Sequence, residues 1–283
     1  DPIVMYYNRS MLDGSGIVYP PTTWEDFARI SNLLTTKDDS NRIIKSGAAL
    51  GHFSNVSNAK GIISMLFMQG GNPIVQETGT QMTTTLGNYI SAYSLDSILE
   101  FYTNFADPLD TSYSWNKSLP MSRDAFSGEN LAFYFGYASE LQSLAVRNPN
   151  QNFLAAPVPQ INGANFKLTS AKVTGVAISA FSQNPETAFI VASIMSSGTF
   201  AQNLSAKLGV APARRDLLAN TPNDSFSPTI YSSALFARSW LDPAPKETEN
   251  IFREMVESVL SNNRTLGEAI SNAGAKLGRL LIR

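Results

Sequence analysis

Ser57 and Lys60 are one helical turn apart at the start of an expected helix, in the run Ser57-Asn58-Ala59-Lys60. A lysine placed one turn after a serine can help to deprotonate the hydroxyl, so this spacing is typical of serine nucleophiles in acyl transfer. The same four residues also form an ordinary helix start, with Asn58 as the capping residue and the lysine in solvent. We favour the second interpretation and keep acyl transfer as an alternative.

The companion motifs of penicillin-recognising serine acyltransferases do not follow Ser57. The one Lys-Ser-Gly triplet, at residues 45–47, precedes the serine, and the sequence contains no Ser-Asp-Asn. His52 is the single histidine and there is no cysteine, which excludes Cys/His zinc sites, iron–sulfur clusters, disulfides and cysteine nucleophiles. His52 is interpreted as a structural or surface residue. The sequence therefore predicts no catalytic residue, no metal site and no cofactor.

The overall composition argues against two further classes of function. The 283 residues carry 21 Lys and Arg against 23 Asp and Glu, a formal net charge of -2, so binding of nucleic acid by a general basic surface is not expected. No stretch approaches 18 consecutive apolar residues, so no membrane span is predicted. A chain of this length can bury the core of one large domain or two ordinary ones.

Aromatic residues beside turn residues are the remaining candidates for ligand contact. Tyr137 follows Gly136, and Trp240 precedes the turn at Asp242-Pro243. Flat aromatic faces together with Asn, Ser and Gln side chains suit sugar rings, whose faces are apolar and whose rims carry hydroxyls. Most other aromatic side chains are expected in the core.

The elements that position these residues can be predicted from periodicity and capping. A short apolar run predicts a strand at 3–7, and Thr23 with Asp26 predicts a capped helix with Trp24, Phe27, Ile30 and Leu34 on its buried face. Further patterns predict helices at 58–69 and 94–106, and then a helix, a turn and a buried strand within 121–144. Two more strands are predicted at 153–159 and 172–178, followed by helices that begin near 184, 197, 231, 245 and 265. This order indicates an α/β protein whose final helices pack back on an earlier sheet.

A series of short motifs, in the same order along the chain, resembles one family. The motifs are Met5-Tyr6-Tyr7-Asn8-Arg9, Gly16-Ile17, Pro20-Pro21-Thr22-Thr23-Trp24-Glu25-Asp26-Phe27, Gln69-Gly70-Gly71, Ala125-Phe126-Ser127-Gly128-Glu129, Ala156-Pro157-Val158-Pro159, Gly175-Val176-Ala177-Ile178-Ser179, Asn184-Pro185-Glu186, Gly209-Val210-Ala211-Pro212 and Leu266-Gly267-Glu268-Ala269-Ile270. Together they resemble the extracellular solute-binding proteins of ABC importers, the maltose-binding-protein-like group.

The resemblance implies a fold, a location and a partner. The fold class is α/β, periplasmic-binding-protein-like type II, with two lobes joined by a hinge and the ligand held between them. The resemblance implies no catalysis, delivery of the solute to an ABC transporter permease, and a place at the extracellular face of the membrane or in the periplasm, lipid-anchored or as a soluble exported protein.

The position of the motifs along the chain implies that the N-terminal part of lobe one is absent. Residues 1–176 are assigned to the main part of lobe two, 177–237 to a helical part of lobe one, and 238–283 to helices that return to lobe two. An apolar patch is expected on the surface where the lobes would meet.

The resemblance also suggests ligand contacts, which are Tyr7, Asn55, Asn58, Gly136, Tyr137 and Trp240. The stretch 55–60 matches a helix-start loop that offers acids and aromatics in sugar-binding relatives, and here it has neither. A sugar or oligosaccharide is the favoured solute, while a peptide, a polyol or another small polar solute stays open. A ligand-sensing or structural domain with the same fold is a further alternative.

Overall fold

A five-stranded mixed sheet lies at the centre of the protein in a computed structural model, which describes residues 1–88, 91–164 and 166–282. The strand order is β2-β3-β6-β1-β7. The first strand pairs antiparallel with both of its neighbours, and β3 runs parallel to β6. The strands are β1 Ile3–Asn8, β2 Thr36–Lys37, β3 Ile43–Ala48, β6 Leu131–Tyr137 and β7 Phe153–Ala156.

Strand β6 is buried along its whole length because helices cover both faces of the sheet. Phe133 and Phe135 lie on one face, where their rings contact Phe27 of α2 (Trp24–Leu34) at centroid distances of 5.3 Å. Tyr134 lies on the opposite face and stacks on Phe126 of α5 (Ser122–Ser127). Burial on both faces explains why this strand reads as a continuous apolar run.

The helix α2 begins as its sequence predicts. The hydroxyl of Thr23 accepts from the backbone N–H of Asp26, and the four residues of the predicted apolar face are buried. The indole of Trp24 donates to the side-chain oxygen of Gln69 at 2.6 Å, and the Gln69 amide nitrogen donates to the carbonyls of Pro159 and Leu168. One buried amide thus ties α2, α3 (Ala59–Gln69) and the loop before β8 together.

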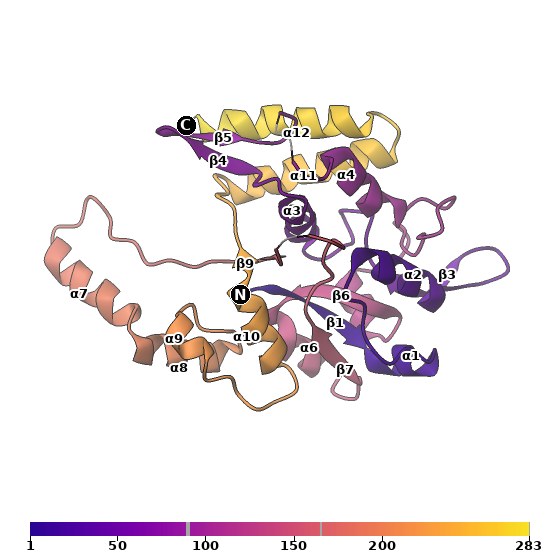
Figure 1. Ribbon diagram of the computed structural model, residues 1–283, viewed down its shortest axis with the longest axis horizontal. Coiled ribbons are helices and arrows are strands. Elements are labelled where there is room, and N and C mark those ends of the chain that lie inside the picture. Colours follow the sequence, from indigo (N-terminus) through magenta and orange to yellow (C-terminus); the bar gives the residue numbers. More distant parts are fainter. Residues whose placement is uncertain (89–90, 165, 283) are drawn as a thin grey trace.

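The C-terminal helices form a layer of their own. Figure 1 shows α11 (Pro245–Leu260) and α12 (Leu266–Leu281) in yellow above α3 and α4 (Leu95–Asn104), beside the hairpin of β4 (Val75–Thr78) and β5 (Gln81–Thr84). The α12 helix begins with a capping box in which Thr265 and Glu268 bond each other's backbone N–H. The sequence predicts that the final helices pack on an earlier sheet, and in the structure that sheet is the β4–β5 hairpin, against which α12 packs. The two helices also pack on α4, and α11 packs on α3.

The orange helices of Figure 1 extend away from the sheet. They are α7 Pro185–Met195, α8 Gly198–Leu208, α9 Arg215–Leu218 and α10 Ser227–Leu235, and of these α10 contacts β1 and β7. Two short parallel strands, β8 (Thr169–Ser170) and β9 (Ala237–Arg238), mark the two points where the chain passes to and from these helices. The remaining short helices are α1 Arg9–Gly14 and α6 Leu141–Arg147.

The predicted apolar surface is present on this part of the chain. No residue of α7 is buried, and Phe181, Phe189 and Ile190 are 89%, 65% and 59% exposed. An open surface pocket of about 600 Å³ is lined by residues of 176–184 and of α7.

The predicted strand at 172–178 is wrong. Lys172 bonds the backbone of Asp1, but residues 173–178 are exposed and belong to no strand, because within the described residues no strand lies beside them to accept their backbone hydrogen bonds. The cap predicted at Asn58 is also wrong in its chemistry: Asn58 precedes α3, but it has φ 61 and its side chain makes no capping hydrogen bond.

Candidate functional site: the Glu140 cluster and Trp240

The N-terminus of α3 and the carboxyl end of β6 meet at a group of polar side chains, which we call the Glu140 cluster: Asn58, Tyr134, Tyr137 and Glu140. One carboxylate oxygen of Glu140 accepts from Asn58 Nδ2 at 2.7 Å and from the Tyr137 backbone N–H at 2.9 Å. The other accepts from the Tyr134 hydroxyl at 2.6 Å. The left-handed backbone of Asn58 turns its amide toward this carboxylate instead of toward the helix.

Tyr137 ends β6 and lies against the first turn of α3. Its side chain is 7% exposed, and a Cβ built on Gly61 would lie 2.7 Å from the Tyr137 hydroxyl, so the glycine makes room for the ring. The ammonium of Lys172 lies 3.7 Å from the ring centroid. Burial, followed by the negative charges of Glu140 and Glu249, raises the pKa of Tyr137 to about 12, so the phenol is neutral at pH 7.

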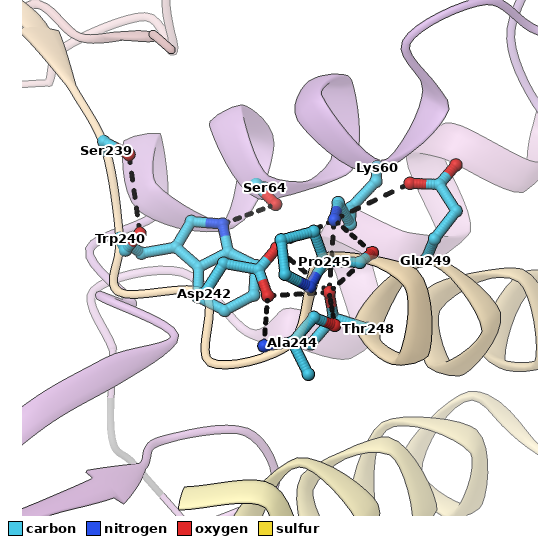
Figure 2. A network of polar contacts seen from close by, with 9 residues as sticks. All are labelled: Lys60, Ser64, Ser239, Trp240, Asp242, Ala244, Pro245, Thr248 and Glu249. Atoms are coloured by element: carbon cyan, nitrogen blue, oxygen red, sulfur yellow. Dashed lines mark hydrogen bonds and ion pairs between the residues drawn. The ribbon is translucent and has the colours of Figure 1, made fainter. Parts of the chain in front are cut away.

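Trp240 is held on two sides and is only partly buried. Its indole N–H donates to the hydroxyl of Ser64 on α3 at 3.1 Å (Figure 2). Its ring stacks on Phe252 of α11 with the planes 19° apart. A ring fixed at one edge and on one face has little rotamer freedom to lose when another flat group contacts its other face.

A lysine-centred network fixes the segment that carries Trp240. Lys60 donates to Asp242 at 2.8 Å, to the Pro245 carbonyl at 3.1 Å and to Thr248 at 3.1 Å (Figure 2). The carboxylate of Asp242 also accepts from the buried Thr248 hydroxyl at 2.8 Å. The network joins the first turn of α3 to the start of α11.

Asn55 and Tyr7 lie away from the Glu140 cluster. The Asn55 amide nitrogen donates to the carbonyls of Asn116 and Leu119, and its oxygen accepts from the Trp115 indole, so all of its polar atoms hold the loop that precedes α5. Tyr7 pairs with Phe133 in the sheet, four residues along β1 from the partner of Tyr137, which is roughly 13 Å away. The structure thus brings Asn58, Gly136 and Tyr137 together at the first turn of α3, and Trp240 contacts the same helix one turn later through Ser64.

Several residues of this region were missed by the sequence analysis: Glu140, Lys172, Ser64, Asp242 and Thr248. A signal exists for Glu140, because an acid three residues after Tyr137 can bond the Tyr137 backbone N–H as in a capping box. The others become neighbours only through the fold, since Lys60 and Asp242 are 182 residues apart.

The serine and lysine of the acyl-transfer alternative do not act on each other. The Lys60 ammonium is bound to Asp242, Pro245 and Thr248, and no hydrogen bond joins it to Ser57 in the described part of the chain. Lys60 is therefore not placed to act as the general base for Ser57, which the hypothesis of a serine nucleophile requires. His52 is half-buried, and burial lowers its pKa, with Lys117 as the second cause.

Comparison with known protein families shows to which family the chain belongs. The sequence model of the family described as bacterial extracellular solute-binding protein matches residues 1–197. The chain belongs to this family. A search of curated protein sequences found no match to this solute-binding protein.

Solved structures show that this solute-binding protein has the type II periplasmic-binding-protein-like fold predicted from its motifs. It is similar to a cyclo/maltodextrin-binding protein complexed with maltotetraose, at 14% identity and TM-score 0.71, over 98% of this chain and 68% of that one. It is also similar to the cyclic alpha-maltosyl-1,6-maltose binding protein from Arthrobacter globiformis, at 15% identity and TM-score 0.70, over 99% and 70% of the two chains.

A third similar structure is an ABC substrate-binding protein from Listeria monocytogenes in complex with cycloalternan. Its identity to this solute-binding protein is 17% and its TM-score is 0.65, over 98% of this chain and 69% of that one. At such identities the likeness describes the fold alone.

The described residues contain neither a membrane-spanning helix nor a cluster of metal-ligating side chains. No helix among them is long and apolar enough to cross a membrane. Over the same residues, no three His, Asp or Glu side chains gather as a metal site would require.

Proposed function

We propose that this solute-binding protein captures a sugar or oligosaccharide and delivers it to the permease of an ABC importer, without chemical change to the solute. The observation that carries the proposal is Trp240, a partly buried ring fixed by Ser64 and Phe252. A sugar presents flat apolar C–H faces, and an immobilised indole is well suited to contact them. The similar structures include a protein complexed with maltotetraose and a cyclic alpha-maltosyl-1,6-maltose binding protein, which supports the same class of solute.

The division into lobes is part of the proposal. Residues 1–176 and 238–283 form lobe two, residues 177–237 form a helical part of lobe one, and β8 and β9 lie at the crossings between them. The ligand then contacts Trp240 and the Glu140 cluster on lobe two. Tyr7, Asn55 and Gly136 stay predictions as ligand contacts. The extracellular face of the membrane or the periplasm is the proposed location, with or without a lipid anchor.

The proposal is tested by adding sugars to the 283-residue chain and measuring its melting temperature and tryptophan fluorescence. A panel of maltotetraose, cyclodextrin and mannobiose covers linear and cyclic sugars. Trp24 and Trp115 are 5% and 1% exposed, so a change in emission reports mainly on Trp240. A true ligand at a hundred times its dissociation constant stabilises the fold by about 2.7 kcal/mol.

Substitution of Trp240 gives the specific prediction. Trp240→Ala is expected to weaken sugar binding about tenfold or more, as removal of a central aromatic contact does. Trp240→Phe keeps a ring but loses the bond to Ser64, so its affinity falls between the two. Tyr19→Ala, a change at an aromatic side chain that is 80% exposed, is the matched control and leaves affinity unchanged. No response to any sugar of the panel would refute the proposed function.

A further inference from the structure

The ring of Tyr137 is covered by a charged side chain that does not belong to its own element. Tyr137 ends β6, whereas Lys172 follows β8 and precedes residues 173–183, which belong to no helix or strand. The Lys172 ammonium lies over the ring, 3.7 Å from its centroid, and Tyr137 is 7% exposed. The aromatic face predicted to take a sugar is thus occupied by an ammonium group.

Lys172 is held to the ring by its side chain alone. Its backbone N–H donates to the carbonyl of Asp1 at 3.0 Å, which fixes the main chain at this point. Among the ion pairs of the described residues, none includes Lys172, in contrast to Lys60 with its two carboxylate partners. Lys172 is exposed, and a flexible lysine whose main contact is an exposed cation–π interaction can leave the ring at low cost.

We propose that Lys172 is a displaceable cover of Tyr137, which competes with the solute for the same face of the ring. A sugar that stacks on Tyr137 moves the Lys172 ammonium into solvent. The affinity for the sugar is therefore lowered by the free energy of the lost cation–π interaction between Lys172 and Tyr137. This inference rests on the proposed function, because it names Tyr137 as a second stacking surface beside Trp240. The location of Lys172 also places this exchange at the point where the chain leaves lobe two.

Hydroxyl-radical footprinting of the 283-residue chain tests the cover without any ligand. Lys172→Ala is expected to raise the oxidation of Tyr137 at least about threefold, because the ring loses its cover. Lys172→Arg retains a cation over the ring and keeps the wild-type level. Lys167→Ala, at another exposed lysine before β8, is the matched control, and Tyr134 at 1% exposure is the internal reference. Unchanged oxidation of Tyr137 in Lys172→Ala would overturn the proposal.

Calorimetric titration with maltotetraose tests the competition. Lys172→Ala is expected to bind about twofold to fivefold more tightly than the wild type, the range to which an exposed cation–π contact corresponds. An unchanged affinity, or a loss of affinity, would overturn the competition, since a lysine that contacts the sugar directly gives a loss.

The two proposals fail in different ways. If no sugar binds the wild type or Lys172→Ala, the proposed function fails and so does the competition, whereas footprinting still decides whether Lys172 covers the ring. If Lys172→Ala alone binds, the competition stands but the proposed function of the natural chain fails.

Discussion

Gly136 lies between two tyrosine rings that use the space a side chain would need. A Cβ built on Gly136 would lie 2.6 Å from Cε1 of Tyr134 and 3.1 Å from Cε2 of Tyr6. The Tyr6 hydroxyl in turn donates to the carbonyl of Tyr137 at 3.1 Å. The glycine thus lets both rings pack where β6 ends and holds the strand end that carries Tyr137.

Gly136→Ala is therefore expected to lower the free energy of unfolding by about 1–3 kcal/mol, the usual effect of overpacking a well-packed core. Urea unfolding followed by circular dichroism measures it. Gly175→Ala is the matched control, because nothing lies within 4 Å of a Cβ built there, and its change stays within about 0.5 kcal/mol. Equal stability of the two variants would show that the tyrosine rings adjust freely.

For single residues, the sequence predicts the candidates for the site more reliably than it predicts their contact partners. Asn58, Tyr137 and Trp240 were selected because they neighbour helix starts or turns. Glu140 has a local signal toward Tyr137 only. Its contact with Asn58 and that of Ser64 with Trp240 could not be identified, because no local pattern indicates that residues 82 or 176 positions apart will meet. The sequence predicts that the Tyr137 ring is free to contact a sugar, whereas in the structure the Lys172 ammonium lies over that ring.

Helix α3 links the main sheet to the segment that returns from α10. Lys60 in its first turn bonds Asp242 and Thr248, and Ser64 one turn later bonds Trp240 (Figure 2). The side chains of Lys60 and Asp242 are only 18% and 21% exposed, so water screens their attraction less than that of a surface pair.

Lys60→Met removes the cation from the partly buried Asp242 carboxylate, and Asp242→Asn leaves Lys60 with the more distant Glu249 as its one carboxylate partner among the described residues. Lys60→Met and Asp242→Asn are each expected to cost about 1–3 kcal/mol of unfolding free energy, below the loss for a fully buried pair. The double variant loses less than the sum, with a coupling of about 0.5–3 kcal/mol measured by urea unfolding.

The control for this cycle is the exposed pair of Arg29 and Asp26, with side chains 67% and 51% exposed. Arg29→Met is expected to change stability by less than about 1 kcal/mol, as surface ion pairs do. Strict additivity of Lys60→Met and Asp242→Asn would show that the two charges do not stabilise each other.

The elements themselves were largely predictable, and the failures have a physical cause. Helices α2, α8 and α12 follow their caps at Thr23, Ser197 and Thr265, because capping is a local interaction. The strand predicted at 172–178 depends on a partner strand elsewhere, which a pattern of apolar residues cannot supply. The pair β8–β9 was missed for the same reason, since two residues are too few to produce a pattern.

The whole molecule has an uneven distribution of charge and burial. Between residues 173 and 206, Glu186 is the one charged residue of the sequence. The same stretch exposes a group of large apolar side chains, namely Val173, Val176, Ile178, Phe181, Phe189, Ile190, Val191, Ile194, Met195, Phe200 and Leu204. Contiguous apolar surface of this kind marks an interaction site. The resemblance predicted such a patch, but its residues became known only with the fold.

The segment 173–183, which belongs to no helix or strand, also makes the chain vulnerable to proteolysis. Phe181 is 89% exposed in a turn of this segment, so limited chymotrypsin treatment is expected to cut there first. Phe181→Ser removes this cut. The two fragments separate on a denaturing gel but elute together on gel filtration, because α10 packs on β1 and α11 and α12 pack on α3 and α4. Fragments that elute apart would contradict this expectation. If they stay associated, the protein can be assembled from two separately expressed chains, with the break placed just before α7.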